Sequence, residues 1–133
     1  MSSFLSSERG VGLKVIVLGA SGFLGASTSS ALFSAGHDVV TVSRFPSDAK
    51  RLNVLGLQAI SYSELENNLN DYAQRSWIDF SWSGVLGKER DSKVQLGNIE
   101  RVLKNAEFAK ASGAKVFVGI GSQAEYGPVS GSI

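Results

Sequence analysis

The feature that most constrains the fold of this chain is a glycine-rich turn that separates a short apolar segment from an amphipathic one. Before the turn, residues 13–18 read LKVIVL, which is typical of a strand buried on both faces of a sheet. After it, residues 22–35 carry small and apolar side chains at helical spacing, and Gly36 can supply a left-handed cap. Residues 39–43 predict a second strand, so these segments form a βαβ unit.

The same alternation continues along the chain. The further elements that the sequence predicts are a helix over 47–55, a strand over 57–61, a helix over 63–75, a strand over 77–82, a helix over 91–112 and a strand over 115–120. Ser47 is the expected cap of the first of these helices, and Ser63 and Glu66 have capping-box spacing at the start of the second. Five strands alternating with helices predict an α/β fold, a Rossmann-type doubly wound parallel sheet in the order 3-2-1-4-5.

Helix 91–112 has the clearest periodicity in the sequence. Its apolar stripe consists of Leu96, Ile99, Val102, Leu103, Ala106 and Ala109. We expect this stripe to face the sheet, because an amphipathic helix buries its apolar side. Phe108 falls off the stripe.

Composition excludes several classes of function. Among 133 residues, 13 lysines and arginines stand against 12 acidic residues, so a net charge of +1 favours neither nucleic acid nor an anionic membrane as partner. No apolar run approaches the roughly 20 residues of a membrane span. The absence of cysteine and the single histidine, His37, argue against a metal site and are compatible with the cytoplasm. We expect residues 1–12 to form a flexible arm and residues 13–133 to form one domain.

The glycine turn has the spacing GxxGxxG, and each glycine has a physical reason. Gly19 permits the tight turn, Gly22 lets a pyrophosphate approach the amides at the helix N-terminus, and Gly25 lets the helix pack closely on the sheet. The candidate cofactor contacts in this segment are Gly19, Ser21, Gly22, Phe23, Leu24 and Gly25. A turn that merely connects strand to helix is the alternative. No Lys-Ser or Lys-Thr follows, which argues against a nucleotide triphosphate site.

Ser43 and Arg44 follow the second predicted strand, where a cofactor without a 2′-phosphate normally meets an acidic residue. Ser43 can donate a hydrogen bond to a 2′-phosphate, and Arg44 can pair with it or stack on adenine. The sequence therefore favours NADP as cofactor, with NAD possible. The alternative is that Arg44 is a solvated loop residue.

With GASGFLG at 19–25 and SQAEYG at 122–127 both present, the chain resembles the extended short-chain dehydrogenase/reductase family, in particular its NAD-dependent epimerase/dehydratase members that act on nucleotide sugars. The resemblance covers about residues 13–128. It implies that Ser122 takes the position of the catalytic Ser/Thr that hydrogen-bonds the reacting sugar, whereas Tyr126 is not the catalytic tyrosine. A loop hydroxyl without a catalytic role is the alternative for Ser122.

The loop after the fourth predicted strand also matches the family, where it passes the ribose and nicotinamide of the cofactor. The resemblance makes Ser83 and Gly84 candidate cofactor contacts. Trp77 and Trp82 are expected to be packing residues, because alternating bulky side chains on a strand are common in protein cores.

Some positions depart from the family pattern. Asp79 stands where the family usually has His, Gln95 where it usually has Asn, and Ser61-Tyr62 where an acidic residue usually contacts adenine. No Tyr-x-x-x-Lys is present: the residues four positions after Tyr62, Tyr72 and Tyr126 are Glu66, Ser76 and Ser130. In the family that tyrosine, its pKa lowered by the lysine, takes the proton of the substrate hydroxyl. We therefore expect a cofactor-binding domain that is incomplete at its C-terminal end and lacks the last strands and sugar-binding part.

Three hypotheses remain open at this point. The first is a truncated family member that binds a dinucleotide without turnover and whose full-length relatives act on nucleotide sugars. The second is a non-catalytic NADP(H) sensor or scaffold that forms a homodimer through helix 91–112, with Phe108 and Val94 supplying apolar contact. The third is an active site completed by another chain.

Overall fold

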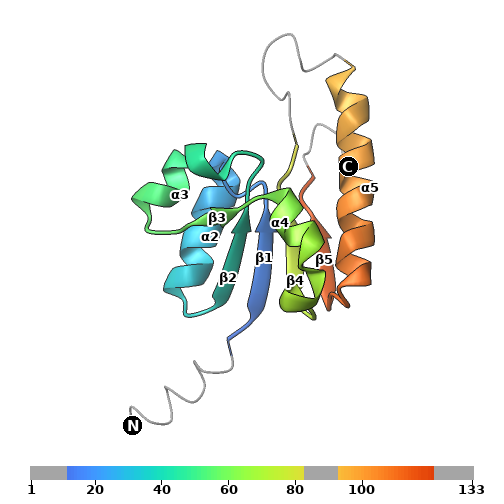
Figure 1. Ribbon diagram of the computed structural model, residues 1–133. Helices are drawn as coiled ribbons and strands as arrows, with labels where there is room; N and C mark the ends of the chain where they lie inside the picture. Colours follow the sequence, from blue (N-terminus) through green and yellow to red (C-terminus); the bar gives the residue numbers. More distant parts are fainter. Residues whose placement is uncertain (1–11, 83–92, 122–133) are drawn as a thin grey trace, which may run out of the picture.

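The computed structural model describes residues 12–82 and 93–121. These residues contain one five-stranded, entirely parallel sheet in the order β3-β2-β1-β4-β5 (Figure 1). The strands are β1 (Lys14–Leu18), β2 (Asp38–Val42), β3 (Ala59–Ile60), β4 (Ser76–Asp79) and β5 (Val116–Gly119). The Rossmann-type fold and the strand order predicted from the sequence are therefore confirmed. The expected N-terminal arm lies outside the described residues, apart from Gly12.

Helices cover both faces of the sheet (Figure 1). They are α2 (Phe23–Ser34), α3 (Lys50–Val54), α4 (Tyr62–Asn67) and α5 (Val94–Ala111), with 3-10 turns η1 (Pro46–Asp48) and η2 (Leu69–Tyr72). Alternate residues of β1 point to opposite faces: Val15 and Val17 pack with α2 and α3, whereas Ile16 and Leu18 pack with α4 and α5. The central strand thus contributes to two cores. Because both of its faces are buried, residues 15–18 are all apolar instead of alternating with polar residues.

Two predicted helix caps are wrong. Ser47 lies inside η1, and α3 begins after Ala49 without a side-chain cap. At α4 the cap is Ser61, whose Oγ accepts a hydrogen bond from the backbone N–H of Glu64 at 3.0 Å. Ser61 is already extended (φ −81°, ψ 163°) where the chain leaves β3, so the helix starts two residues before the predicted capping box.

The helix predicted over 63–75 is also too long. The structure has α4 over six residues, followed by η2 over four. Asn68 ends α4 by donating a side-chain hydrogen bond to the carbonyl oxygen of Glu64 at 2.7 Å. Asparagine competes with helical hydrogen bonds in this way, which explains why a polar stretch rich in Asn does not extend the helix.

The buried face of α5 differs from the predicted apolar stripe. Leu96, Ile99 and Leu103 are 65%, 52% and 61% exposed, whereas Ala109 is buried as expected. The polar side chains that face inward instead are Asn98, Asn105 and Ser112. Phe108, predicted to lie off the core, packs against the cluster around Trp77.

The physical reason lies in polar partners that periodicity does not reveal. Asn105 donates to the buried carboxylate of Asp79 at 3.1 Å, and Ser112 donates to the carbonyl oxygen of Ala109 at 2.8 Å. Burying a polar group costs little free energy when the group has a hydrogen-bond partner. The α5 helix can therefore place these polar side chains against the sheet.

Candidate functional site

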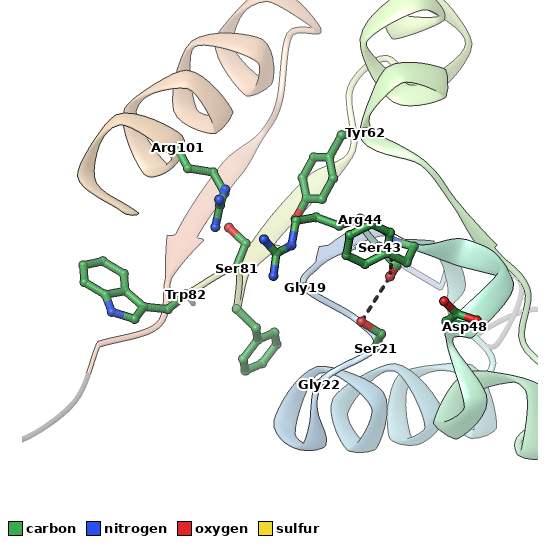
Figure 2. A pocket seen from close by; sticks show the side chains of 12 residues that line it. Gly19, Ser21, Gly22, Ser43, Arg44, Asp48, Tyr62, Ser81, Trp82 and Arg101 are labelled. Carbon is green, nitrogen blue, oxygen red and sulfur yellow. Dashed lines mark hydrogen bonds between the residues drawn. The ribbon is translucent and has the colours of Figure 1, made fainter. Parts of the chain in front are cut away.

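A pocket of about 270 Å³ opens at the carboxyl ends of the strands (Figure 2). Its lining consists of Gly19, Ser21, Gly22, Ser43, Arg44, Phe45, Asp48, Tyr62, Phe80, Ser81, Trp82 and Arg101. The pocket lies where the chain order of the sheet reverses, because β1 pairs with β2 on one side and with β4 on the other. Ligands of open α/β sheets bind at such a switch point.

The glycine turn forms one wall of this pocket through close backbone contacts. Gly19 has φ +68°, and a Cβ on it would lie 2.7 Å from the carbonyl carbon of Phe80. A Cβ on Gly25 would collide with the carbonyl oxygen of Gly19. Gly22, by contrast, has only the carbonyl oxygen of Gly19 near its Cβ position, at 3.5 Å. Two glycines therefore serve packing, and Gly22 keeps the surface open toward the pocket.

Backbone amides at the start of α2 can receive an anion. Gly22 is the N-cap, and the first helical hydrogen bond runs from Ala26 N to Gly22 O at 2.9 Å. The amides of Phe23, Leu24 and Gly25 consequently have no acceptor within the helix. The helix dipole adds positive potential at this end. The side chains of Phe23 and Leu24 are exposed outside the pocket lining, so any contact from these two residues comes from the backbone.

Ser43 connects the end of β2 to the glycine turn. Its side chain is buried, and its Oγ donates to Ser21 Oγ at 3.1 Å while accepting from Phe45 N at 3.2 Å (Figure 2). Arg44 is exposed at the pocket, with its guanidinium carbon 5.6 Å from the ring centre of Phe45. Arg51 of α3 reaches the same turn and donates to the carbonyl oxygen of Ser21 at 3.4 Å. The pocket wall beside β2 therefore carries the guanidinium of Arg44 and the carboxylate of Asp48, and Arg51 approaches the neighbouring turn.

A buried polar cluster shapes the wall beside β4. The Asp79 carboxylate accepts from Ser81 N at 2.7 Å, from Ser81 Oγ, and from Asn105 Nδ2 at 3.1 Å. Asn105 Nδ2 also donates to Ser81 Oγ at 3.1 Å. These donors provide hydrogen-bond partners for both oxygens of the buried carboxylate. Asp79 thus fixes the chain as it leaves β4, which is a structural role for a residue that departs from the family pattern.

Tyr62 enters the pocket from the start of α4. Burial raises the pKa of its hydroxyl above 10.0, and the negative charge of Asp79 acts in the same direction. Contacts with the Ser81 side chain and the Gly19 backbone, together with the charge of Arg101, oppose this rise in pKa. The hydroxyl therefore lies next to the glycine turn and in the field of both charged side chains.

Of the residues predicted from the sequence, the pocket brings together Gly19, Ser21, Gly22, Ser43 and Arg44. Ser83, Gly84 and Ser122 lie outside the described residues. Trp77 is fully buried, as expected for packing, but Trp82 is 47% exposed and lines the pocket.

Sequence reasoning missed six other lining residues, which are Phe45, Asp48, Tyr62, Phe80, Ser81 and Arg101. Phe45, Tyr62, Phe80 and Ser81 lie within three residues of the ends of β2, β3 and β4, so a search of strand ends could have found them. Arg101 lies in the middle of a helix, and no feature of the sequence sets it apart from the other cations of α5.

A family model described as the NAD dependent epimerase/dehydratase family matches residues 15–133 of the chain. The chain belongs to this family. Comparison with curated proteins gave no match. The epimerase/dehydratase assignment makes the chain an NAD(P)-binding module and implies a nicotinamide dinucleotide as cofactor. The pocket fits such a group, because Gly22 leaves space over helix amides at the switch point.

Within residues 12–82 and 93–121, no helix combines the length and the apolar character needed to cross a membrane. The same residues contain no group of three His, Cys, Asp or Glu side chains arranged to hold a metal ion.

Proposed function

We propose that this chain binds NADP(H) as the cofactor-binding part of an epimerase, dehydratase or reductase of nucleotide sugars. The observation that carries the proposal is the open amide cradle at Gly22 and the start of α2, situated at the switch point of the sheet. The pyrophosphate would lie over these amides. The cofactor would accept or return a hydride at its nicotinamide ring, and Ser122 would contact the reacting sugar.

The preference for NADP rests on charge at the end of β2. Arg44 is exposed there, and Arg51 approaches the neighbouring turn. A phosphate can pair with guanidinium groups through charge-assisted hydrogen bonds. Ser43 can contribute by exchanging its bond to Ser21 for one to the phosphate. NAD remains a second ligand, because Asp48 also lines the pocket and its carboxylate can accept from a ribose hydroxyl.

We further propose that the 133-residue chain by itself does not turn over substrate. None of its three tyrosines is followed by lysine at the fourth position. Without that pair, none of the residues that the structure describes supplies the general base that the family reaction requires. An active site completed by another chain is compatible with the same observation.

The lack of cysteine suits a reducing cytoplasm.

Tryptophan fluorescence tests the cofactor proposal, because Trp82 lies in the pocket whereas Trp77 is fully buried. Titration with NADPH and with NADH should quench the emission at sub-millimolar concentration, with NADPH binding more tightly. A Trp82→Phe variant should lose most of the quenching while retaining affinity by calorimetry. Absence of binding for both dinucleotides would contradict the proposal.

A second candidate function is a non-catalytic NADP(H)-binding scaffold that self-associates through α5. The observation that favours it is the exposure of Leu96, Ile99 and Leu103 along one side of this helix. Phe108, which the sequence suggests as part of the dimer contact, packs in the core instead. The exposed side of α5 would supply the apolar contact in its place. Light scattering should show a dimer that an Ile99→Lys substitution converts to monomer. A monomeric wild type would reject this candidate.

A further inference from the structure

Trp82 is an aromatic residue of the pocket that core packing does not explain. It lies just after β4, and its side chain is half exposed, whereas Trp77 is fully buried. Within residues 12–82 and 93–121, neither core cluster includes Trp82, although Phe80, which also lines the pocket, packs against one of them. Ligand pockets are commonly lined by aromatic side chains. Trp82 therefore presents its ring to a ligand rather than to the core.

Hydrogen bonds to α5 orient the indole of Trp82. Its Nε1 donates to Gln95 Oε1 at 2.8 Å, and Asn98 Nδ2 donates to the same oxygen at 3.2 Å. Asn98 is buried, so Gln95 is in turn positioned by a side chain inside the fold. The Nε1–H group is the only hydrogen-bonding group of an indole. Because the protein already uses this group, a ligand at Trp82 meets an aromatic ring and not a polar atom.

The strand order gives the part of the cofactor that Trp82 would meet. Arg44 follows β2, the amides at Gly22 follow β1, and Trp82 follows β4. Because β1 lies between β2 and β4, the glycine turn separates the two ends of the pocket, and Figure 2 shows Trp82 on the side away from Ser43. A dinucleotide with its 2′-phosphate at Arg44 and its pyrophosphate over Gly22 would extend its nicotinamide half toward Trp82.

We propose that the indole of Trp82 stacks on the nicotinamide ring and stabilises the oxidised ring more than the reduced ring. This inference rests on the proposed function and deepens it, because it gives one side chain a part in distinguishing the two redox states of the cofactor. The oxidised nicotinamide ring carries a positive charge, whereas the reduced ring is neutral. Among aromatic side chains, the indole attracts a cation over its face most strongly. Trp82 thus contributes more to the affinity for NADP⁺ than to that for NADPH.

Two charged side chains share this end of the pocket. Arg101 lines it, and the carboxylate of Asp79 accepts a hydrogen bond from the backbone of Ser81, next to Trp82. Arg101 disfavours a cationic ring, whereas Asp79 favours it. A substitution of Trp82 alone leaves both charges in place, so a comparison of variant and wild type isolates the contribution of the indole.

Three ligands test the contact in calorimetric titrations: NADP⁺, NADPH and 2′-phospho-ADP-ribose, which has the same phosphates but no nicotinamide ring. A Trp82→Ala variant should bind NADP⁺ about fourfold more weakly, because the cation–π contact is lost, and NADPH less than about twofold more weakly. It should bind 2′-phospho-ADP-ribose like the wild type, which also shows that the variant is folded.

Two control variants accompany this experiment. Trp82→Phe keeps an aromatic ring and should retain most of the affinity for NADP⁺ that Trp82→Ala loses. Phe33→Ala removes an aromatic side chain that is 56% exposed on α2, outside the pocket lining. It should leave all three affinities unchanged.

The possible outcomes are distinct. If Trp82→Ala binds NADP⁺ as tightly as the wild type, or if it weakens the binding of all three ligands equally, the nicotinamide contact is overturned while the proposed function stands. Equal weakening of NADP⁺ and NADPH, with 2′-phospho-ADP-ribose unchanged, would overturn the preference for the oxidised ring. If the wild type binds none of the three ligands, the proposed function falls together with the inference.

Discussion

The β1-α2-β2 unit and the β4-α5-β5 unit have the same topology but are held together differently. In the first, small and branched side chains and glycines bring the backbone of α2 close to β1. In the second, polar side chains of α5 face the sheet, while Leu96, Ile99 and Leu103 face outward. The comparison indicates that close backbone and apolar packing position the glycine turn, whereas a polar cluster positions the opposite wall of the pocket.

The two units also differ at the sheet itself. β1 is central and buried over residues 15–18, whereas β5 is an edge strand with Val116 and Val118 exposed. Only Phe117 of this strand joins the cluster beneath α5. Among residues 12–82 and 93–121, no strand pairs with the outer side of β5, and an edge strand of this kind can accept a further strand.

The largest predicted effect breaks the close packing of the first unit. Gly19→Ala should destabilise the fold by about 4 kcal/mol, because an L-residue at positive φ is strained and the new Cβ overpacks the backbone. Gly36→Ala is the matched control: φ is +88° there, but no atom lies within 4 Å of the added Cβ. It should cost only about 1 kcal/mol. Urea denaturation of both variants measures the difference in the free energy of unfolding. If both variants lost the same stability, the close contact at Gly19 would be contradicted.

A second prediction compares leucines with opposite burial. Leu52 is fully buried in the cluster beneath α2 and α3, so Leu52→Ala should cost about 3 kcal/mol. Leu103 belongs to the stripe that periodicity assigns to the core, yet Leu103→Ala should cost less than about 0.5 kcal/mol because the side chain is exposed. If chemical denaturation gave similar losses for both, the orientation of α5 would be wrong.

The smallest effect concerns Tyr62, which borders both units. Burial raises its pKa above the ordinary 10.0, so the folded state keeps the proton that the unfolded state releases. The corresponding stability is complete below pH 10.0 and is lost as the pH rises from there toward the folded-state pKa. Tyr62→Phe should flatten this alkaline decline in urea midpoints relative to the wild type. An unchanged pH profile would show that the hydroxyl is not buried.

Sequence reasoning captured the first unit well because its elements follow from local rules. The strand at β1, the helix start at Gly22 and the left-handed cap at Gly36 each depend on one residue type at one position. The length of α4 was not predictable in this way, since Asn68 ends the helix through a side-chain bond.

The site was predicted only in part for a related reason. Gly22 and Arg44 are adjacent to strand ends, where motif spacing indicates a role. The orientation of α5, and with it the arrival of Arg101 in the pocket, depends on Asn105 finding Asp79 across 26 positions of sequence. Periodicity contains no information about that pairing, so it assigned the wrong face to the core.

The central claim is that the amides at the start of α2 bind the phosphates of a dinucleotide. The most direct measurement is a nitrogen–proton NMR correlation spectrum of the labelled chain, recorded during titration with NADPH. The account predicts that the amide signals of Gly22, Phe23 and Leu24 shift most and that the shifts saturate together. Unchanged signals at these three residues in the presence of saturating NADPH would contradict it.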